Sequence, residues 1–243
     1  MKTPLLSLCF LLSSTLCGLS TAQTKQDTII VTTEHYYPFS ISDKDGAVYG
    51  ASADKIHELF KRSKLVYQMN MMSWNRAFEL ARNNADTCVF STSRTKERES
   101  SFHWIGPIIT GNWAVFGSPD KLNKVTNLRD IKQSSIGTEE GQVALSYLAD
   151  KGFKMVTSTE SVTTFKNVAF GRIDYATAAD THGKKIIAEN NLKDKVVWLF
   201  NYSSSDYYLA CNPKMSNRTI GLLKKNLREM KADGSFKSIE NKY

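Results

Sequence analysis

Segments with strand character alternate with segments of helical periodicity along this chain, and the alternation begins a second time near its middle. Residues 28–33 (TIIVTT) form a β-branched run typical of a buried strand, and apolar residues at helical spacing follow Ser52, a suitable N-cap. Further strands are expected at 65–71 and 87–91, with a helix at 74–82 between them. Alternating strands and helices favour a parallel α/β sheet, whose ligands bind beyond the carboxyl ends of the strands. The loops after Thr33 and Phe90 are therefore the first places to expect a site.

The same pattern restarts after Pro107 and predicts a second α/β unit of similar size. Strands are expected at 113–116, 134–138, 154–157 and 175–178, with helical segments at 128–131, 142–151 and 162–170. A strand at 207–211 and an amphipathic helix at 220–230, stopped by Asp233-Gly234, complete the chain. No internal repeat is visible in the sequence.

The first 22 residues have the features of a cleavable secretory signal. Lys2 precedes an apolar stretch over residues 4–19, and the small residues Ser20 and Ala22 follow where a signal peptidase cleaves. Cys17 raises the alternative of a lipoprotein signal, which Leu16 disfavours because a small residue is wanted before the cysteine. No later segment approaches the roughly 18 apolar residues of a membrane helix, so a secreted, soluble mature chain is expected.

The chain carries a formal net charge of +8, and a basic surface can serve nucleic acid or an anionic membrane. Its lysines and arginines are scattered, however, with no run of four or more. The charge therefore indicates a solvated basic surface, and we expect no nucleic-acid partner.

Motifs for the common catalytic chemistries are missing from the sequence. The four histidines, His35, His57, His103 and His182, lie far apart, and none has a second ligand at metal-binding spacing. There is no G-x-S-x-G, Walker loop or G-x-G-x-x-G. Glu139-Glu140 is a carboxylate pair, but adjacent side chains point in different directions, and we expect both to be solvated loop residues. No metal site, no cofactor and no enzymatic activity are predicted.

Residues 91–98 (STSRTKER) form the segment with the clearest binding chemistry. They follow a predicted strand, and Thr95 is a candidate N-cap for a helix that would begin there. Free amides at a helix start, hydroxyl groups and a guanidinium group together suit a carboxylate. A capped surface helix with two arginines is the alternative interpretation of the segment alone.

The mature chain resembles the bacterial periplasmic solute-binding proteins of ABC importers for polar amino acids, the family of the lysine/arginine/ornithine, histidine and glutamine binding proteins. The resemblance rests on the order and spacing of motifs along the whole mature chain. They are Tyr36-Tyr37-Pro38-Phe39, Gly50 with Asp54, Trp74 before a helix, Asp86 leading into residues 91–98, residues 102–107 (FHWIGP), Ile136-Gly137, Lys231-Ala232-Asp233-Gly234 and the ending IENKY.

Carried onto this sequence, the resemblance implies a set of ligand-binding residues. Arg98 would hold the α-carboxylate of the ligand, with Ser91 and Ser93 near it. Tyr36 would form an aromatic wall and Trp74 the opposite face, a pairing of rigid apolar surfaces that also suits a ligand site on physical grounds. A role as core aromatics is the alternative for Tyr36 and Trp74.

The second half of the chain matches the family less well. The family places its ammonium-binding aspartate five residues after an aspartate that ends a helix-to-strand turn, whereas here Asp180 follows Asp174 by six. Asp180 is the candidate for that role. Gly141-Gln142-Val143 stands where the family has hydroxyl residues after the glycine, so the identity of the ligand stays open.

The resemblance also implies the fold: an α/β, two-lobed periplasmic binding protein of type II, each lobe a central mixed sheet flanked by helices. Two crossover segments, near 108–112 and 201–206, would act as the hinge. Lobe 1 would comprise residues 23–109 and 206–243, and lobe 2 residues 110–205. In the family's arrangement the returning strand lies beside the strand that holds Cys88, so a Cys88–Cys211 disulfide is implied, with two buried thiols as the alternative.

The expected function is periplasmic binding of a small polar solute, an amino acid or related carboxylate, by a monomer that delivers it to the membrane permease of an ABC importer. The same fold also serves as a sensor domain and, in some relatives, as a dehydratase. An enzyme would need an acid or base in the cleft, and Asp180, Glu139 and His103 are the candidates.

Overall fold

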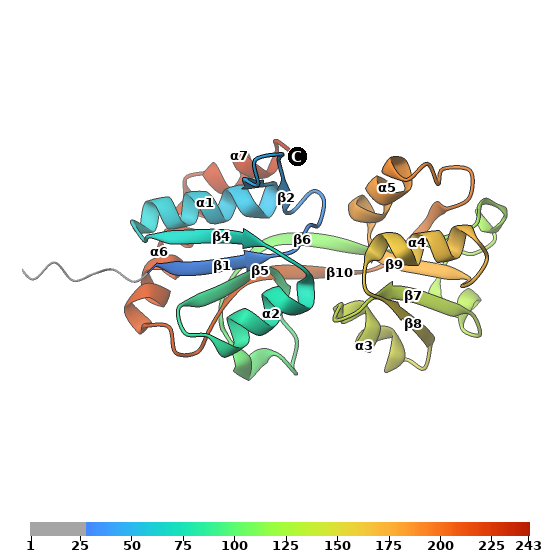
Figure 1. Ribbon diagram of the computed structural model, residues 1–243, viewed down its shortest axis with the longest axis horizontal. Coiled ribbons are helices and arrows are strands. Elements are labelled where there is room, and N and C mark those ends of the chain that lie inside the picture. The colour runs from blue at the N-terminus through green and yellow to red at the C-terminus, as the bar shows by residue number, and fades with distance from the viewer. Residues whose placement is uncertain (1–27) are drawn as a thin grey trace, which may run out of the picture.

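Two long strands hold the molecule together, as the computed structural model, which describes residues 28–243, shows. Strands β6 (His103–Gly117) and β10 (Val197–Cys211) pair antiparallel along their length and pass through both lobes (Figure 1). They lie at the centre of one eight-stranded sheet of order β4-β1-β5-β10-β6-β9-β7-β8. The predicted secretory signal lies outside the described residues.

Lobe 1 is built on the half of the sheet that holds three parallel strands, β4 (Tyr67–Met71), β1 (Ile29–Thr33) and β5 (Thr87–Ser93). Helices α1 (Ala51–Ser63) and α6 (Asn217–Ala232) cover one face, and α2 (Trp74–Asn83) covers the other. Because strand residues alternate in direction, Cys88 and Phe90 enter the core under α1 while Val89 enters the core under α2. A short hairpin of β2 (Ile41–Ser42) and β3 (Val48–Tyr49) and helix α7 (Ser235–Glu240) complete this lobe.

Lobe 2 repeats this layering on β9 (Tyr175–Ala179), β7 (Ser135–Glu139) and β8 (Lys154–Ser158). Helices α4 (Ser161–Ala169) and α5 (Asp180–Glu189) bury Phe116 and Phe165 on one face. Helix α3 (Val143–Ala149) covers the other face, where Val115 and Leu148 are buried. The expected two-lobed fold with a mixed sheet in each lobe is thereby confirmed, and no helix among residues 28–243 has the length and apolar character of a membrane span.

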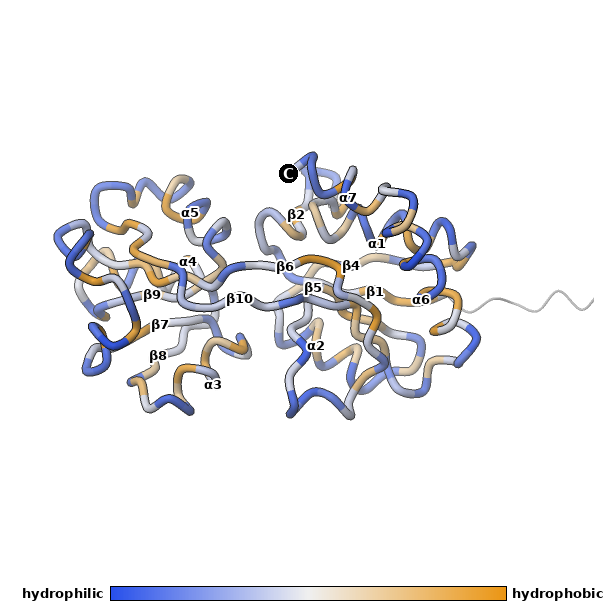
Figure 2. Tube along the Cα trace, turned by 180° about the vertical axis from the view of Figure 1, so that it is seen from behind, coloured by the Kyte–Doolittle hydropathy of each residue, from blue (hydrophilic) through white to orange (hydrophobic). Residues whose placement is uncertain are grey.

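The two crossovers correct the prediction of short strands at 113–116 and 207–211. Both segments belong to strands of 15 residues, and the expected hinge positions pair within them, Gly111 with Ser205 and Thr110 with Asp206. The stretch between the lobes is pale to blue in Figure 2, in keeping with its hydroxyl, amide and carboxyl side chains. A strand that no helix covers needs no apolar face, so the hydrophobic pattern did not reveal it.

Two helical predictions also differ from the structure. The helix expected to begin at Thr95 is absent: a turn over 96–98 leads into a single 3-10 turn, Glu99–Ser101. Conversely, α5, which contains Gly183, was not among the predicted helices. A Cβ atom at Gly183 would lie 2.3 Å from the ring of Phe116, so glycine is needed there for the helix to approach the sheet, at a cost in helix propensity.

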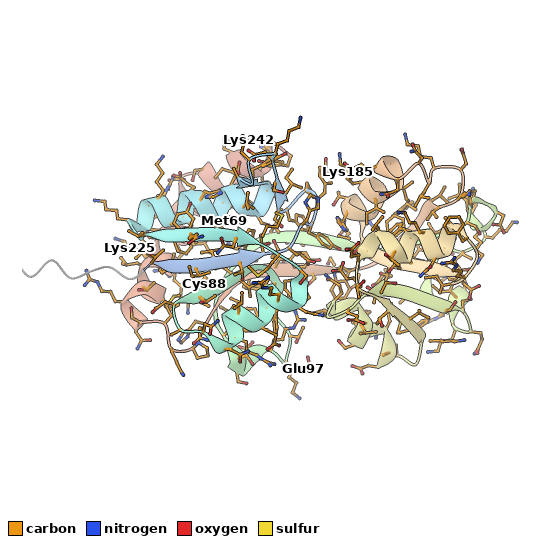
Figure 3. The ribbon with its side chains drawn as sticks, viewed as in Figure 1. Met69, Cys88, Glu97, Lys185, Lys225 and Lys242 are labelled. Atoms are coloured by element: carbon orange, nitrogen blue, oxygen red, sulfur yellow. A yellow bond between two sulfur atoms is a disulfide. The ribbon has the colours of Figure 1, made fainter. Side chains whose placement is uncertain are left out.

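Cys88 and Cys211 face each other on β5 and β10 in the core of lobe 1, with Cα atoms 4.0 Å apart and their sulfurs joined (Figure 3). The bond links residues 123 positions apart in the sequence. It therefore ties the amino-terminal part of lobe 1 to the strand that returns from lobe 2.

We expect the oxidised protein to contain no alkylatable thiol, and its reduction to lower the free energy of unfolding by about 4 kcal/mol, because so long a loop constrains the unfolded chain. Intact mass after alkylation of the mature protein, with and without reductant, and chemical denaturation of both forms would measure this. Two alkylated cysteines in the non-reduced protein would contradict the prediction.

Lys55 of α1 is fully buried, next to Ile108 of strand β6. Its Nζ atom donates to the Ile108 carbonyl oxygen at 2.8 Å and to Glu240 Oε2 at 3.0 Å, and it lies 3.9 Å from the centre of the Phe236 ring. Burial lowers the pKa of Lys55, while Glu240 opposes that shift. The carboxyl-terminal helix α7 thus supplies the counter-charge of a buried ammonium group.

Glu240→Ala is expected to lower the free energy of unfolding by about 1–3 kcal/mol, because it leaves the Lys55 ammonium group buried without its carboxylate. Glu229→Ala is the matched control: it removes an exposed pair with Lys225 on α6, worth about 0–1 kcal/mol. Denaturant titrations of both variants would measure the difference, and equal effects would show that α7 contributes no buried ion pair.

Candidate functional site

The two lobes meet around a small cavity beside the interlobe strands, here called the inner cavity. Its volume is about 20 Å³, enough for one or two water molecules. Ser93 and Tyr207 line it from lobe 1, and Trp113 donates a hydrogen bond from its ring nitrogen to the Tyr207 hydroxyl oxygen at 3.0 Å. The other lining residues are Tyr36, Thr138, Gln142, Val143, Ala144, Ser161, Thr177, Ala178 and Ala179. In this closed arrangement the inner cavity is too small for an amino acid.

Tyr36 crosses the cleft from lobe 1 to lobe 2. Its hydroxyl oxygen accepts a hydrogen bond from the Ala179 amide at 2.9 Å, at the point where β9 ends and α5 begins. Its ring stacks on the imidazole of His182, with centroids 3.8 Å apart and planes inclined by 16°. One aromatic side chain thereby holds both the sheet and a helix of the opposite lobe.

The carbonyl oxygen of Gly141 is a second contact between the lobes. It accepts hydrogen bonds from the Trp74 ring nitrogen at 3.1 Å and from Arg98 Nη2 at 2.9 Å. Gly141 has φ +78°, and a Cβ atom there would lie 2.4 Å from Asn75 Oδ1 and 2.8 Å from the Trp74 ring. This loop of lobe 2 can approach α2 so closely only because residue 141 has no side chain.

Glu34 and Gln142 form a third contact, in which the Gln142 amide donates to Glu34 Oε1 at 3.1 Å. Glu34 follows β1 directly, and Gln142 precedes α3. Nearby, Glu139 at the end of β7 accepts from the Ser161 hydroxyl at 2.6 Å and from the Ser161 amide at 3.1 Å. Both carboxylates thus lie at carboxyl ends of parallel strands, where ligands of such sheets bind.

A larger space, here called the outer pocket, opens between the lobes on the other side of this contact. Its volume is about 550 Å³, within the range of about 300–1,000 Å³ that is usual for small-molecule sites. Lobe 1 contributes Glu34, His35, Tyr37, Met71, Met72, Ser73 and Trp74; lobe 2 contributes Glu139, Thr159, Glu160, Ser161, Val162, His182, Lys185, Ile186, Glu189 and Asn190. Lys185, on α5, is visible at the junction of the lobes in Figure 3.

Burial sets the protonation of the groups around this pocket. It raises the pKa of Glu34 well above its ordinary value, with the charge of Glu139 as the next cause; the Gln142 hydrogen bond and Arg98 oppose the shift. Burial also raises the pKa of Glu139, against its hydrogen bonds from Ser161. For His182, burial and the nearby His35 lower the pKa to about 3, so its imidazole is neutral at neutral pH.

Four of the predicted site residues lie where the lobes meet. Tyr36 and Ser93 line the inner cavity, Trp74 lines the outer pocket, and Arg98 reaches Gly141 between them. The Arg98 guanidinium group also lies 4.8 Å from the centre of the Phe78 ring, and burial lowers its pKa to about 10, so it keeps its charge at neutral pH. The roles of these four residues in ligand binding stay predictions.

Ser91 and Asp180 line neither cavity. Ser91 has φ 58° in the middle of β5, and its buried hydroxyl has no hydrogen-bond partner in the described part of the chain. Asp180 is the first residue of α5, where its carboxylate accepts from the amide of Thr181 at 2.7 Å. The structure explains Asp180 as a helix-start carboxylate and gives it no contact with Arg98.

Several residues that the fold brings to the cleft were not among the predicted site residues, notably Glu34, Gln142, Ser161 and His182. The expectation that Glu139 is a solvated loop carboxylate is wrong: it ends β7 and is half-buried in the outer pocket, while Glu140 is exposed. Glu34 could have been found, because it stands in the loop after Thr33 that the strand pattern had singled out. Nothing in the sequence marked His182, whose helix was not foreseen.

The arrangement places hydrogen-bonding groups, aromatic walls and charges of both signs around the space between the two lobes. Among residues 28–243 no three His, Cys, Asp or Glu side chains are grouped so as to hold a metal ion.

Solved structures confirm that this architecture is shared. A histidine kinase sensor domain with similarity to periplasmic binding proteins matches with a TM-score of 0.81 at 19% identity, covering 89% of this chain and 95% of the other. An arginine third transport system periplasmic binding protein from Legionella pneumophila has a TM-score of 0.76 at 19% identity, covering 89% and 99%. An ancestral amino-acid-binding protein, a precursor of cyclohexadienyl dehydratase, has a TM-score of 0.74 at 19% identity, covering 89% and 94%.

No curated protein matches the sequence. The model of one protein family matches residues 28–243, the whole of the part that the structure describes. The chain therefore belongs to the bacterial extracellular solute-binding proteins, family 3.

Proposed function

We propose that this protein binds a small carboxylate-bearing solute, an amino acid or a close relative, between its lobes in the periplasm and delivers it to the permease of an ABC importer. The protein performs no chemistry on the solute in this proposal. Family membership and the similarity to amino-acid-binding structures support the class of ligand. The observation that carries the proposal furthest is the contact of Arg98 with the Gly141 carbonyl oxygen between the lobes.

In this closed arrangement the Gly141 oxygen binds donors of the kind that a ligand carboxylate would use. It accepts from a guanidinium group and an indole N–H, both of lobe 1, close to aromatic rings. Two guanidinium hydrogen bonds are used, to Gly141 and weakly to the Ser93 carbonyl oxygen at 3.4 Å, and Arg carries five donors. When the lobes part, Gly141 moves away with lobe 2 and a carboxylate can reach Arg98, whose remaining donors can hold it when the lobes close again.

Arg98→Ala is expected to weaken ligand binding about thirty-fold to a few thousand-fold, because removing one partner of a desolvated ion pair costs about 2–5 kcal/mol. Arg98→Lys should lose less but remain impaired, since an ammonium group is a point charge without the planar fork. Calorimetry with the strongest binder from a thermal-shift screen of amino acids and organic acids would measure the series.

Arg94→Ala is the matched control for this series. Arg94 lies four residues earlier, is exposed, and forms hydrogen bonds with Glu99 at 2.7 and 2.5 Å outside the cleft. It should bind the ligand as the wild type does. Wild-type affinity in Arg98→Ala would remove the carboxylate anchor from the proposal.

Ligand binding requires, in this proposal, that the lobes rotate about the predicted hinge near 108–112 and 201–206. The predicted lobe boundaries at 109/110 and 205/206 lie on either side of one pair of the β6–β10 ladder, Thr110 with Asp206. A cleft open on one side cannot desolvate a polar solute from both faces, so closure accompanies tight binding. The closed contacts of Tyr36, Gly141 and Gln142 are the contacts that rotation would break.

Gly141→Ala tests closure without altering a side chain that binds solute. Its methyl group would meet Asn75 and the Trp74 ring at 2.4 and 2.8 Å, so we expect the lobes to stay farther apart. Affinity should fall about tenfold or more if closure loses about 1.4 kcal/mol. Small-angle scattering with saturating ligand should show a larger radius of gyration than for the wild type.

Gly171→Ala controls for backbone strain in this comparison. Gly171 also has positive φ, +69°, yet a Cβ atom at this position would have nothing within 4 Å, so the variant carries the conformational cost of roughly 1–2 kcal/mol without a clash. This variant should close and bind as the wild type does. Full closure of Gly141→Ala would show that the 141 loop does not limit the approach of the lobes.

A sensor role is the second candidate, favoured by the structural similarity to a histidine kinase sensor domain. It differs from the transport role in partner and not in ligand chemistry. Uptake of labelled ligand by cells with and without the protein separates the two, since binding without any effect on uptake supports the sensor.

A further inference from the structure

Helix α6 concentrates positive charge on the surface of lobe 1. Five lysines and arginines and a single glutamate give its 16 residues a net charge of +4, half of the +8 of the whole chain. No residue of α6 lines the inner cavity or the outer pocket, so this charge lies outside the proposed solute site. Lys225 of this helix lies toward the end of lobe 1 that is far from lobe 2 (Figure 3).

The core of lobe 1 fixes which side of α6 faces solvent. Ile220, Leu223 and Leu227 are buried under the helix, and the Asn226 side chain donates to the Ser63 hydroxyl oxygen of α1 at 3.1 Å. The opposite side, here called the basic face, presents five exposed residues: Arg218, Gly221, Lys224, Lys225 and Arg228. Its four cations extend over about 15 Å of the helix axis, which is more than one small anion can contact.

Three other helices give a cation near their end an internal partner. Arg62 on α1, Arg82 on α2 and Lys185 on α5 each form an ion pair with a glutamate one turn away. On the basic face only Lys225 has such a pair, with Glu229 at 3.7 Å. The basic face therefore departs from the pairing seen on α1, α2 and α5.

The remaining cations of the basic face are unpaired. Among residues 28–243 nothing forms an ion pair or hydrogen bond with the side chains of Arg218, Lys224 or Arg228. Lys224 and Arg228 also stand four residues apart, a spacing at which like charges destabilise a helix. The fold thus bears a repulsion that an anionic partner outside the chain would relieve.

Gly221 lies in the middle of the basic face and is a second, independent indication of a partner. It is three residues from Arg218 and Lys224 and four from Lys225, so these three side chains surround it on the helix surface. Glycine is a poor helix former, and a Cβ atom at Gly221 would have nothing within 4 Å, so packing within the described chain does not require it. Because residue 221 has no side chain, a group held by the three cations can reach the helix surface.

We propose that the basic face binds the phosphate groups of anionic phospholipids, with one headgroup over Gly221 between Arg218, Lys224 and Lys225. A membrane surface offers many phosphates at once, and each basic residue near it raises the affinity about fivefold. The inference goes beyond the proposed function and does not depend on the solute. Binding through α6 would hold lobe 1 on a membrane and leave the cleft free, since α6 lines neither the inner cavity nor the outer pocket.

The test is cosedimentation of the mature protein with vesicles of phosphatidylglycerol and phosphatidylcholine in equal parts, beside vesicles of phosphatidylcholine alone. At about 10 mM salt, where charges act over about 30 Å, the wild type should bind the anionic vesicles only. Binding should weaken at about 100 mM salt, where the screening length is about 10 Å. No binding to the anionic vesicles at low salt, or equal binding to the neutral ones, would overturn the proposal.

Lys224→Gln combined with Arg228→Gln should lower the affinity for anionic vesicles about 25-fold, because two contributions of about fivefold are lost. The matched control combines Lys166→Gln with Lys193→Gln, which removes the same charge from exposed positions on lobe 2. This control should bind the vesicles as the wild type does. Equal losses in the two double variants would attribute binding to overall charge and remove α6 from the proposal.

Gly221→Glu tests the place of the headgroup with one substitution. Its carboxylate would lie one turn from Arg218, Lys224 and Lys225 and would pair with them from within the chain, so we expect at least tenfold weaker vesicle binding. Glutamate is also a better helix former than glycine, so thermal denaturation should show a fold at least as stable as the wild type. Ala149→Glu, exposed at the end of α3, adds the same charge and should bind normally. Unweakened binding by Gly221→Glu would contradict the proposal.

Glycerol 3-phosphate separates a lipid surface from a free phosphate as the source of the anion. Added at the same phosphate concentration as the accessible lipid, it should leave the protein on the vesicles, because a single phosphate cannot contact cations spread over about 15 Å. Displacement of the protein at that concentration would assign the basic face to a soluble phosphate and overturn the lipid assignment.

Discussion

The antiparallel pairing of β6 with β10 is the interaction on which the rest of the molecule depends. The two ends of each strand lie in different lobes. One hydrogen-bonded ladder therefore runs through the hydrophobic cores of both lobes and through the stretch between them. Backbone hydrogen bonds continue the ladder between the two cores, through the pairs Thr110–Asp206, Gly111–Ser205 and Asn112–Ser204. A two-stranded ribbon can twist and bend more readily than a sheet covered by helices, which is why the proposed hinge lies where Gly111 pairs with Ser205.

The interface between the lobes is polar, whereas the core of each lobe is apolar. This difference limits the free energy that holds the lobes together. Tyr36, Trp74 and Arg98 each donate or accept one hydrogen bond across it, contacts that water replaces at small net cost when the lobes part. Inter-domain contacts of this kind are expected to be reversible. The buried Glu34 carboxylate adds a penalty to the closed side. A balance of such small free energies would let a solute bound between the lobes shift the equilibrium between open and closed lobes.

Much of the fold could be predicted from the sequence, because periodicity of apolar residues records burial. The strands at residues 29–33, 87–93 and 135–139 and the helices α1, α2 and α4 lie close to their expected places. The polar middle of β6 and β10 has no apolar periodicity, so the length of these strands could not be predicted. Gly183, a poor helix former, made α5 hard to recognise as a helix. In the site, the aromatic and guanidinium groups could be recognised by residue type. Glu34 and Glu139 could not, because they line one pocket only when the two lobes come together, and no local sequence pattern predicts that contact.

The disulfide between Cys88 and Cys211 has a topological consequence. It closes a covalent ring that contains β6, all of β10 and every element of lobe 2. For a chain that emerges from its amino terminus onward, lobe 2 is contiguous and can fold early, while lobe 1 must wait for β10 and α6 to return. Ring closure is then among the last covalent events of maturation. Once it is made, a single peptide-bond cleavage within lobe 2 leaves both fragments attached to one molecule.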